Sequence, residues 1–114
     1  MPDTLIETSE IKTRDWNSRT SLLICPRCGA DLLHHEGITS FDRGEDAPKV
    51  VKTSVAAGKV SVDPFASNQG NPSSRRDGIV IDFSCEGCGE APMQLVIAQH
   101  KGSTEIGWRY QEHD

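Results

Sequence analysis

The segments Cys25-Pro26-Arg27-Cys28-Gly29 and Cys85-Glu86-Gly87-Cys88-Gly89 decide the fold of this chain, and together they contain all of its cysteines. A C-x-x-C turn directs two sulfur atoms toward one point, and four converging thiolates suit a tetrahedral, borderline-soft cation such as Zn²⁺. The glycine after each pair permits a positive φ angle, which turns backbone N–H groups toward the sulfurs. The two segments therefore predict one metal site built from both cysteine pairs.

Other uses of paired cysteines fit the sequence less well. Redox C-x-x-C motifs open a helix in a βαβ unit, whereas the residues around both pairs have the character of strands. Disulfides are typical of exported chains, and residues 1–20 lack the apolar segment of a signal peptide. Iron is the closer rival, because the Cys-Pro-Arg-Cys-Gly turn also resembles the iron knuckle of rubredoxins. Ligand residues alone do not separate the two metals, and zinc is the expected one.

The spacing between the pairs is unusual. Between Cys28 and Cys85 lie 56 residues, against roughly 15–20 in the compact four-cysteine pattern. Each doubling of a loop costs only about 0.6 kcal/mol, so the longer loop costs about 1 kcal/mol more. Structural zinc binding supplies on the order of 10–16 kcal/mol in small peptides. A zinc site therefore tolerates this insertion, provided that strands within it bring the two pairs together.

The two knuckles resemble those of the zinc-ribbon superfamily. That resemblance implies a small antiparallel sheet held by two metal-bearing turns, with Cys25, Cys28, Cys85 and Cys88 as the zinc ligands. The whole chain is also similar to small uncharacterised zinc-ribbon proteins of bacteria and their mobile elements, notably in residues 41–46 and 99–102. Ribbons serve in transcription, translation, nucleic-acid binding and protein contacts, so the resemblance implies no activity.

Composition limits the fold and the class of protein. The 114 residues are enough for one domain, and with 35% hydrophobic and 5% aromatic residues the core should be thin. The net charge is −5, and four thiolates around one Zn²⁺ would add two further negative charges. Such a chain has no general attraction for phosphate backbones. No apolar run approaches the length of a membrane span, so we expect a soluble, cytoplasmic protein.

Period-2 alternation predicts a mainly β fold. Strands are expected over residues 79–84, 93–99 and 105–110, and a β-hairpin over residues 50–62. The resulting architecture is an antiparallel, zinc-ribbon-like sheet with a long hairpin and loop insertion at residues 30–78, inside a domain at 21–110. We expect flexible tails at residues 1–20 and 111–114. The polar loop 66–78 should be either mobile or functional.

Four basic residues are candidates for contact with a partner: Arg75, Arg76, Lys101 and Arg109. Adjacent guanidinium groups in a polar loop suit a phosphate or a partner's carboxylates. The competing interpretation pairs these arginines with the chain's own acidic turn, Asp42 to Asp46. Acids confined to one turn do not form a Mg²⁺ site, which takes carboxylates from several elements.

The sequence argues against an enzyme. A site closed by four cysteines leaves no open position for a catalytic water, and no phosphate-loop or nucleophile motif is present. His34 and His35 are adjacent and would point to opposite faces of a strand. We therefore expect a structural zinc module that binds a protein partner. The alternatives are a nucleic-acid-binding ribbon and an acidic inhibitor, encoded by a mobile element, of a host nucleic-acid-binding protein.

Overall fold

The computed structural model describes residues 5–112, which form strands and no helix, as the sequence predicted. The strands are β1 (Ile6–Thr8), β2 (Thr13–Asp15), β3 (Ser21–Leu23), β4 (Leu33–Asp42), β5 (Val50–Ala56), β6 (Lys59–Ala66), β7 (Gly78–Cys85), β8 (Met93–His100) and β9 (Ser103–Tyr110). No helix in this part of the chain is long and apolar enough to cross a membrane.

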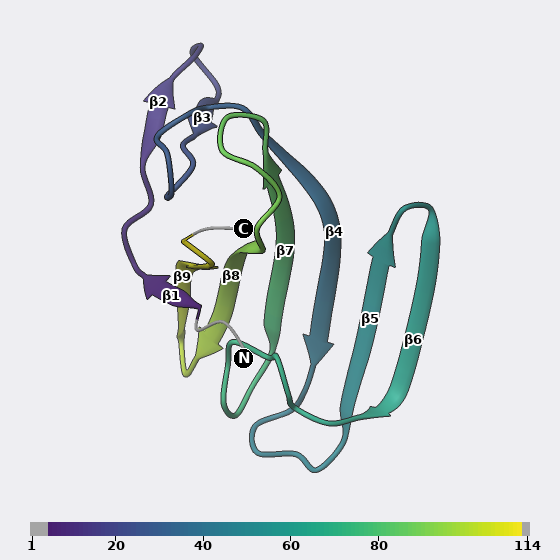
Figure 1. The fold of residues 1–114 in the computed structure, drawn as a ribbon. Coiled ribbons are helices and arrows are strands. Elements are labelled where there is room, and N and C mark those ends of the chain that lie inside the picture. The colour runs from purple at the N-terminus through teal and green to yellow at the C-terminus, as the bar shows by residue number, and fades with distance from the viewer. Residues whose placement is uncertain (1–4, 113–114) are drawn as a thin grey trace.

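The strands form one large antiparallel sheet and a small hairpin (Figure 1). The seven-stranded sheet has the order β1-β9-β8-β7-β4-β5-β6, and β2 pairs with β3 in a separate two-stranded sheet. The predicted hairpin between the two valine-rich runs is confirmed as β5 and β6, joined at Ala57 and Gly58. The second cysteine pair lies at the turn between β7 and β8, also as predicted.

Pairing of β4 with β7 explains how the long insertion is accommodated. Leu33 lies opposite Cys85, and Phe41 lies opposite Gly78, so the two strands run together along their whole length. A bulge between His35 and Gly37 interrupts the register. The chain leaves the first knuckle along β4 and returns to the second along β7, which places the two knuckles side by side.

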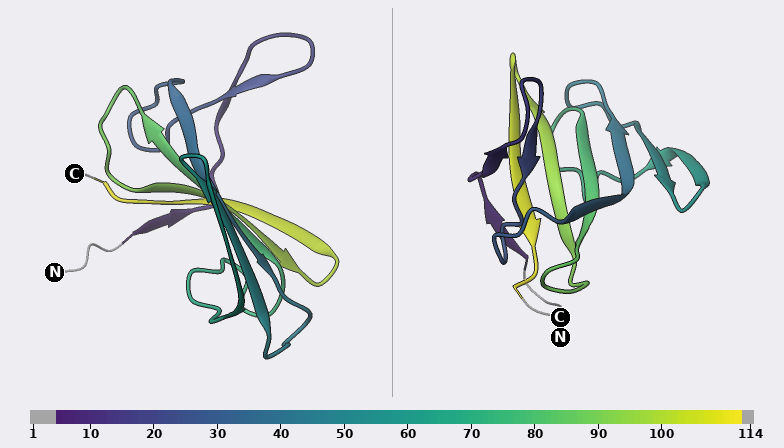
Figure 2. Two further views of the ribbon diagram at one scale, coloured as in Figure 1. Left: turned by 90° about the vertical axis from the view of Figure 1, so that its right-hand side faces the viewer. Right: turned by 90° about the horizontal axis from the view of Figure 1, so that it is seen from above.

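Two small cores lie on opposite faces of the sheet and near opposite ends of its strands. The knuckle core contains Cys25, Cys85, Met93, Leu95 and Trp108, and the loop core contains Phe41, Val50 and Val80. In the left view of Figure 2, the β2–β3 hairpin and the 66–78 loop project from opposite sides of the twisted sheet. We call these sides the knuckle face and the loop face.

Two short strands, β1 and β2, lie within the predicted N-terminal tail. Strand β1 pairs with β9, where Thr8 lies opposite Trp108, and β2 pairs with β3. Ile11 packs against the knuckle core, while Trp16 stays 66% exposed. Strands of three residues bury too few side chains to leave a periodic pattern, which is why the sequence did not reveal β1 and β2. Residues 1–4 and 113–114 of the two predicted tails lie outside the described residues.

The 66–78 loop is a packed cover, an outcome that the sequence analysis did not consider. Gly70 approaches the ring of Phe41, and an added Cβ there would lie 3.6 Å from that ring. The buried Ser73 donates its hydroxyl to the carbonyl of Gln99 at 2.9 Å, and the amide of Asn71 donates to the carbonyl of Asn68. The loop therefore closes the loop core with side-chain and backbone hydrogen bonds, in place of regular structure.

Candidate metal centre

The four cysteine sulfurs converge on one point. All lie within 4.8 Å of one another, with Sγ–Sγ distances of 3.7 Å between Cys25 and Cys88 and 3.6 Å between Cys28 and Cys85. Four sulfurs about 2.3 Å from a tetrahedral metal would be about 3.8 Å apart, whereas a disulfide requires about 2.05 Å. The cluster therefore has the size of a four-thiolate metal site, and the thiols are free.

The two knuckles are built by their backbones. Gly29 and Gly89 adopt positive φ angles of 81° and 104°, the conformation for which glycine was expected. In the first knuckle the amide of Cys25 donates to the carbonyl of Ala30 at 2.7 Å, which closes the turn. In the second, the amide of Gly87 donates to the Sγ of Cys85 at 3.3 Å. The Gly87 N–H thus points at a sulfur and favours its thiolate form.

The sulfurs differ in burial and so in acidity. Burial raises the pKa of the Cys25 thiol to about 12 and also raises the pKa of Cys85. The backbone N–H of Ala30 lowers the pKa of the exposed Cys28. Two thiolates held this far from water require a positive charge nearby, and a divalent cation is the strongest source of one at this point.

Arg27 is a functional residue that the sequence analysis missed. From the first knuckle it reaches the second, where its Nε donates to the Sγ of Cys88 at 3.2 Å. Its Nη1 donates to the carbonyls of Ala91 and Gln111, at 3.1 and 2.8 Å. The guanidinium therefore places a fixed positive charge beside the sulfurs and ties both knuckles to the end of β9. A basic residue between the paired cysteines was the available signal.

None of the described histidines joins the cluster. His34 contacts Glu86, which raises the pKa of its imidazole, and His35 lies edge-on to Phe83 on the knuckle face. The two side chains thus lie on opposite faces, as the strand geometry predicted. His100 is exposed at the end of β8, and His113 lies outside the described residues.

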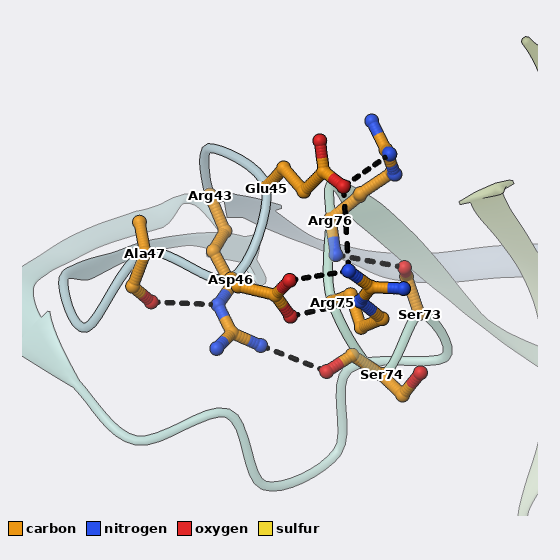
Figure 3. Close-up of polar contacts among 8 residues, drawn as sticks. All are labelled: Arg43, Glu45, Asp46, Ala47, Ser73, Ser74, Arg75 and Arg76. Carbon is orange, nitrogen blue, oxygen red and sulfur yellow. Dashed lines mark hydrogen bonds and ion pairs between the residues drawn. The ribbon is translucent and has the colours of Figure 1, made fainter. Parts of the chain in front are cut away.

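The acidic turn pairs with the arginines of the 66–78 loop (Figure 3). Arg75 donates to both carboxylate oxygens of Asp46, including an Nε–Oδ1 bond of 2.8 Å, and contacts Glu45. Arg76 contacts Glu45 at 2.9 Å. Arg43 holds the base of the turn by donating to the carbonyls of Ala47 and Ser74. This internal pairing is the competing interpretation that the sequence allowed for these residues.

The other two candidate contact residues lie apart from Arg75 and Arg76. Arg109 projects from the loop face of β9 and donates to the carbonyl of Gly70 and the Oε1 of Gln94. Lys101 occupies the turn between β8 and β9 with a φ of 55°. Two of the four basic side chains are thus engaged by the acidic turn and a third by neighbours on the sheet.

Comparisons with known proteins leave the site to be interpreted on its own geometry. No protein-family model, curated protein or solved structure matches the chain.

Proposed function

We propose that the four cysteines hold one structural zinc ion and that the chain acts by binding another protein. The observation that carries the first part is the cluster of sulfurs, whose spacing fits a tetrahedral ion with four thiolate ligands. A complete shell of protein ligands leaves no position for substrate or water, so we also propose that the site has no catalytic role. When bound, zinc would supply folding energy.

Elemental analysis of untagged protein tests this metal assignment. We expect one zinc per chain and a colourless protein whose circular dichroism changes when a strong chelator is added. Iron would be detected by its content and by the colour of its thiolate complex, and would replace zinc in the proposal. A fully folded chain without metal would contradict the structural role.

An open apolar surface supports the second part. It lies on the knuckle face, beyond the part that the β2–β3 hairpin and the knuckles cover, and consists of Ile38, Val55, Val60, Val62, Ile79, Ile97 and Ile106. In one cross-strand row, Ile106 lies opposite Ile97, which in turn lies opposite Ile79. In the next row, Ile38 is opposite Val55, which is opposite Val60. The first row continues through Ser40 and Thr53 to Val62, so neither row carries a charged side chain between β9 and β6.

Exposure distinguishes this surface from the rest of the sheet. Ile38, Val55 and Ile106 are 44%, 47% and 48% exposed, although they lie in the interior of their strands. The uncovered part of the loop face, by contrast, carries Arg109, Gln94 and Asp82 in adjacent strands, linked by hydrogen bonds. Neighbouring exposed apolar side chains in the middle of a sheet often mark a protein-binding surface.

The basic residues give less support to nucleic-acid binding. Arg75 and Arg76 are neutralised by Glu45 and Asp46, and the net charge is −5. A phosphate backbone would have to displace these carboxylates. The open apolar surface is therefore the better-supported contact site, and its partner should present an apolar patch.

Site-specific photo-crosslinking tests the protein-binding proposal. A photoreactive phenylalanine analogue at position 38 or 106 would lie on the open apolar surface, and the same analogue at Gln69 would lie on the exposed loop of the other face. In extract from the source cells, we expect one protein to be crosslinked from positions 38 and 106 and not from 69. Equal capture from all three positions, or none from 38 and 106, would contradict the assignment.

A further inference from the structure

The outermost strand of the sheet has features that suit pairing with a second copy of the chain. Strand β6 forms one edge of the seven-stranded sheet, and Figure 1 shows no element beyond it. Its residues Lys59 to Phe65 are all exposed. The opposite edge, β1, has only three residues. Because β6 is the longer edge, it presents most of the unpaired backbone available for adding a strand.

The hairpin turn determines which backbone groups of β6 face outward. Ala57 and Gly58 have positive φ angles of 51° and 76°, as in a two-residue type I′ turn. In such a hairpin the closing pair, here Ala56 and Lys59, is hydrogen-bonded, and hydrogen-bonded pairs then alternate along the ladder. Ser61 and Asp63 therefore direct their N–H and C=O groups toward β5, whereas Val60 and Val62 direct theirs outward.

The sequence around these two valines complements itself. In the segment Lys59-Val60-Ser61-Val62-Asp63, an antiparallel copy centred on Ser61 places each Val60 opposite Val62 and each Lys59 opposite Asp63 of the other chain. Lys59 makes no ion pair with any residue in 5–112. The Oδ1 of Asp63 accepts from the amide of Phe65, which leaves its second oxygen for a partner. Within one strand the two charges are about 13 Å apart, too far to pair.

We propose that two copies of this chain associate about a two-fold axis through antiparallel pairing of their β6 strands. Each of the two Val60–Val62 pairs supplies two backbone hydrogen bonds, because all of these groups point outward. The Lys59–Asp63 pairs lie on the loop face, and the valine side chains meet on the knuckle face. Val60 and Val62, which are 69% and 60% exposed in the single chain, would be partly covered.

Other registers of β6 against its copy would form fewer favourable contacts. A shift of two residues in one direction puts Pro64, which has no N–H, opposite Val60 and removes hydrogen bonds. A shift in the other direction puts Val62 opposite the turn residue Gly58. In both cases Lys59 and Asp63 lose each other as partners, so one register is selected.

The charges on β6 could instead protect this edge against pairing with another strand. Charged residues and prolines often block edge strands, since self-pairing then brings like charges together. On β6 the two charges are opposite in sign and symmetric about Ser61, so self-pairing brings unlike charges together. Pro64 lies beyond the segment that pairs. The edge is thus protected against extended pairing and open to this one dimer.

Charge exchange between chains tests the proposed pairing directly. Sedimentation of the zinc-loaded full chain should show a reversible dimer whose dissociation constant rises about tenfold in Lys59→Glu or in Asp63→Lys, since two cross-strand pairs become repulsive. An equimolar mixture of the two variants should restore association as a heterodimer, in which positions 59 and 63 of the two chains again carry opposite charges. Native mass spectrometry would identify the heterodimer by its mass.

A proline substitution provides the backbone control. Val62→Pro removes an outward N–H without removing a bond to β5, so it should abolish the dimer and leave the circular dichroism unchanged. The structure-matched control Val55→Thr lies on the same face in β5 and should dimerise normally. Wild-type protein that sediments as a monomer up to about 1 mM would overturn the proposal. So would a dimer that the charge variants and their mixture do not affect.

Discussion

The two ends of the sheet are closed by different kinds of interaction. At the knuckle end, Ile11, Leu23 and the two cysteine turns pack against the core that contains the buried Trp108 and Met93, and the four sulfurs converge there. At the loop end, the 66–78 loop closes over Phe41, and its outer rim is held by exposed ion pairs of Arg75 with Asp46 and Glu45. A thin core is therefore closed at one end by turns whose four sulfurs are spaced for a metal ion, and at the other by polar loop contacts.

Removal of the metal should have the largest effect. Structural zinc contributes on the order of 10–16 kcal/mol in small peptides, comparable to the whole stability of about 5–15 kcal/mol of a typical domain. We expect Cys85→Ser, or chelation, to unfold both ends, because β7 and β8 contribute to both cores. In a Trp16→Phe background, Trp108 is the sole tryptophan, and its emission should shift to the red. An unchanged emission after the metal is removed would contradict this.

The Phe41→Ala substitution should destabilise the loop end of the sheet and leave the knuckle end able to bind metal. Phe41 is 2% exposed in the loop core, and truncating a buried phenylalanine costs about 3–5 kcal/mol. We expect the midpoint of chemical denaturation to fall while folded protein still binds one metal ion. The matched control is Phe65→Ala, which removes an 84% exposed ring and should change stability little. Equal losses in the two variants would mean that the loop end has no core of its own.

The Arg27→Ala substitution should weaken the metal site without abolishing it. It removes one hydrogen bond to the Sγ of Cys88 and two to backbone carbonyls, and groups that support metal ligands typically change affinity 10–100-fold. Competition with a chromogenic chelator would measure the loss. Arg27→Lys keeps the positive charge and should recover part of the affinity. Full recovery by lysine would show that charge alone matters, and no loss in the alanine variant would exclude the role.

Neutralising Asp46 should have the smallest effect. Arg75 lowers the pKa of the Asp46 carboxyl from its ordinary value of 3.8, so folding favours the ionised form. The contribution to stability is present above pH 3.8 and is lost as the pH falls through the lowered pKa. Asp46→Asn mimics the protonated acid at neutral pH, where thiolates still bind metal. We expect faster hydrogen exchange at the Asp46 amide, less so in about 1 M salt, and no change in the control Asp42→Asn.

The fold class and the sulfur cluster were predictable because their signals are local in the sequence. The alternation of residues in β7, β8 and β9 reflects a sheet with a buried face. The glycines after Cys28 and Cys88 reflect the positive φ angles that the structure has at these positions. The expected hairpin of β5 and β6 also followed from two valine-rich runs around Gly58.

What the sequence did not reveal depends on contacts between distant residues. Arg27 reaches Gln111 across the fold, and β1 exists only because β9 offers it an edge. The 66–78 loop has almost no apolar side chains, yet Gly70 and Ser73 fit it against the sheet. Neither periodicity nor composition records such contacts, since each involves one residue from a distant segment.

The register of β4 and β7 has a consequence for how this chain can be shortened. Phe41 and Gly78 are cross-strand neighbours. The segment between them, which includes β5, β6 and the 66–78 loop, therefore begins and ends at one pair of adjacent residues. A two-residue turn in place of residues 42–77 would reconnect Phe41 to Gly78 and should leave the sulfurs where they are. It would also bring the cysteine pairs close to the spacing of roughly 15–20 residues found in compact four-cysteine sites. Strands β5 and β6 and the 66–78 loop are thus one insertion between β4 and β7, and the four cysteines all lie outside it.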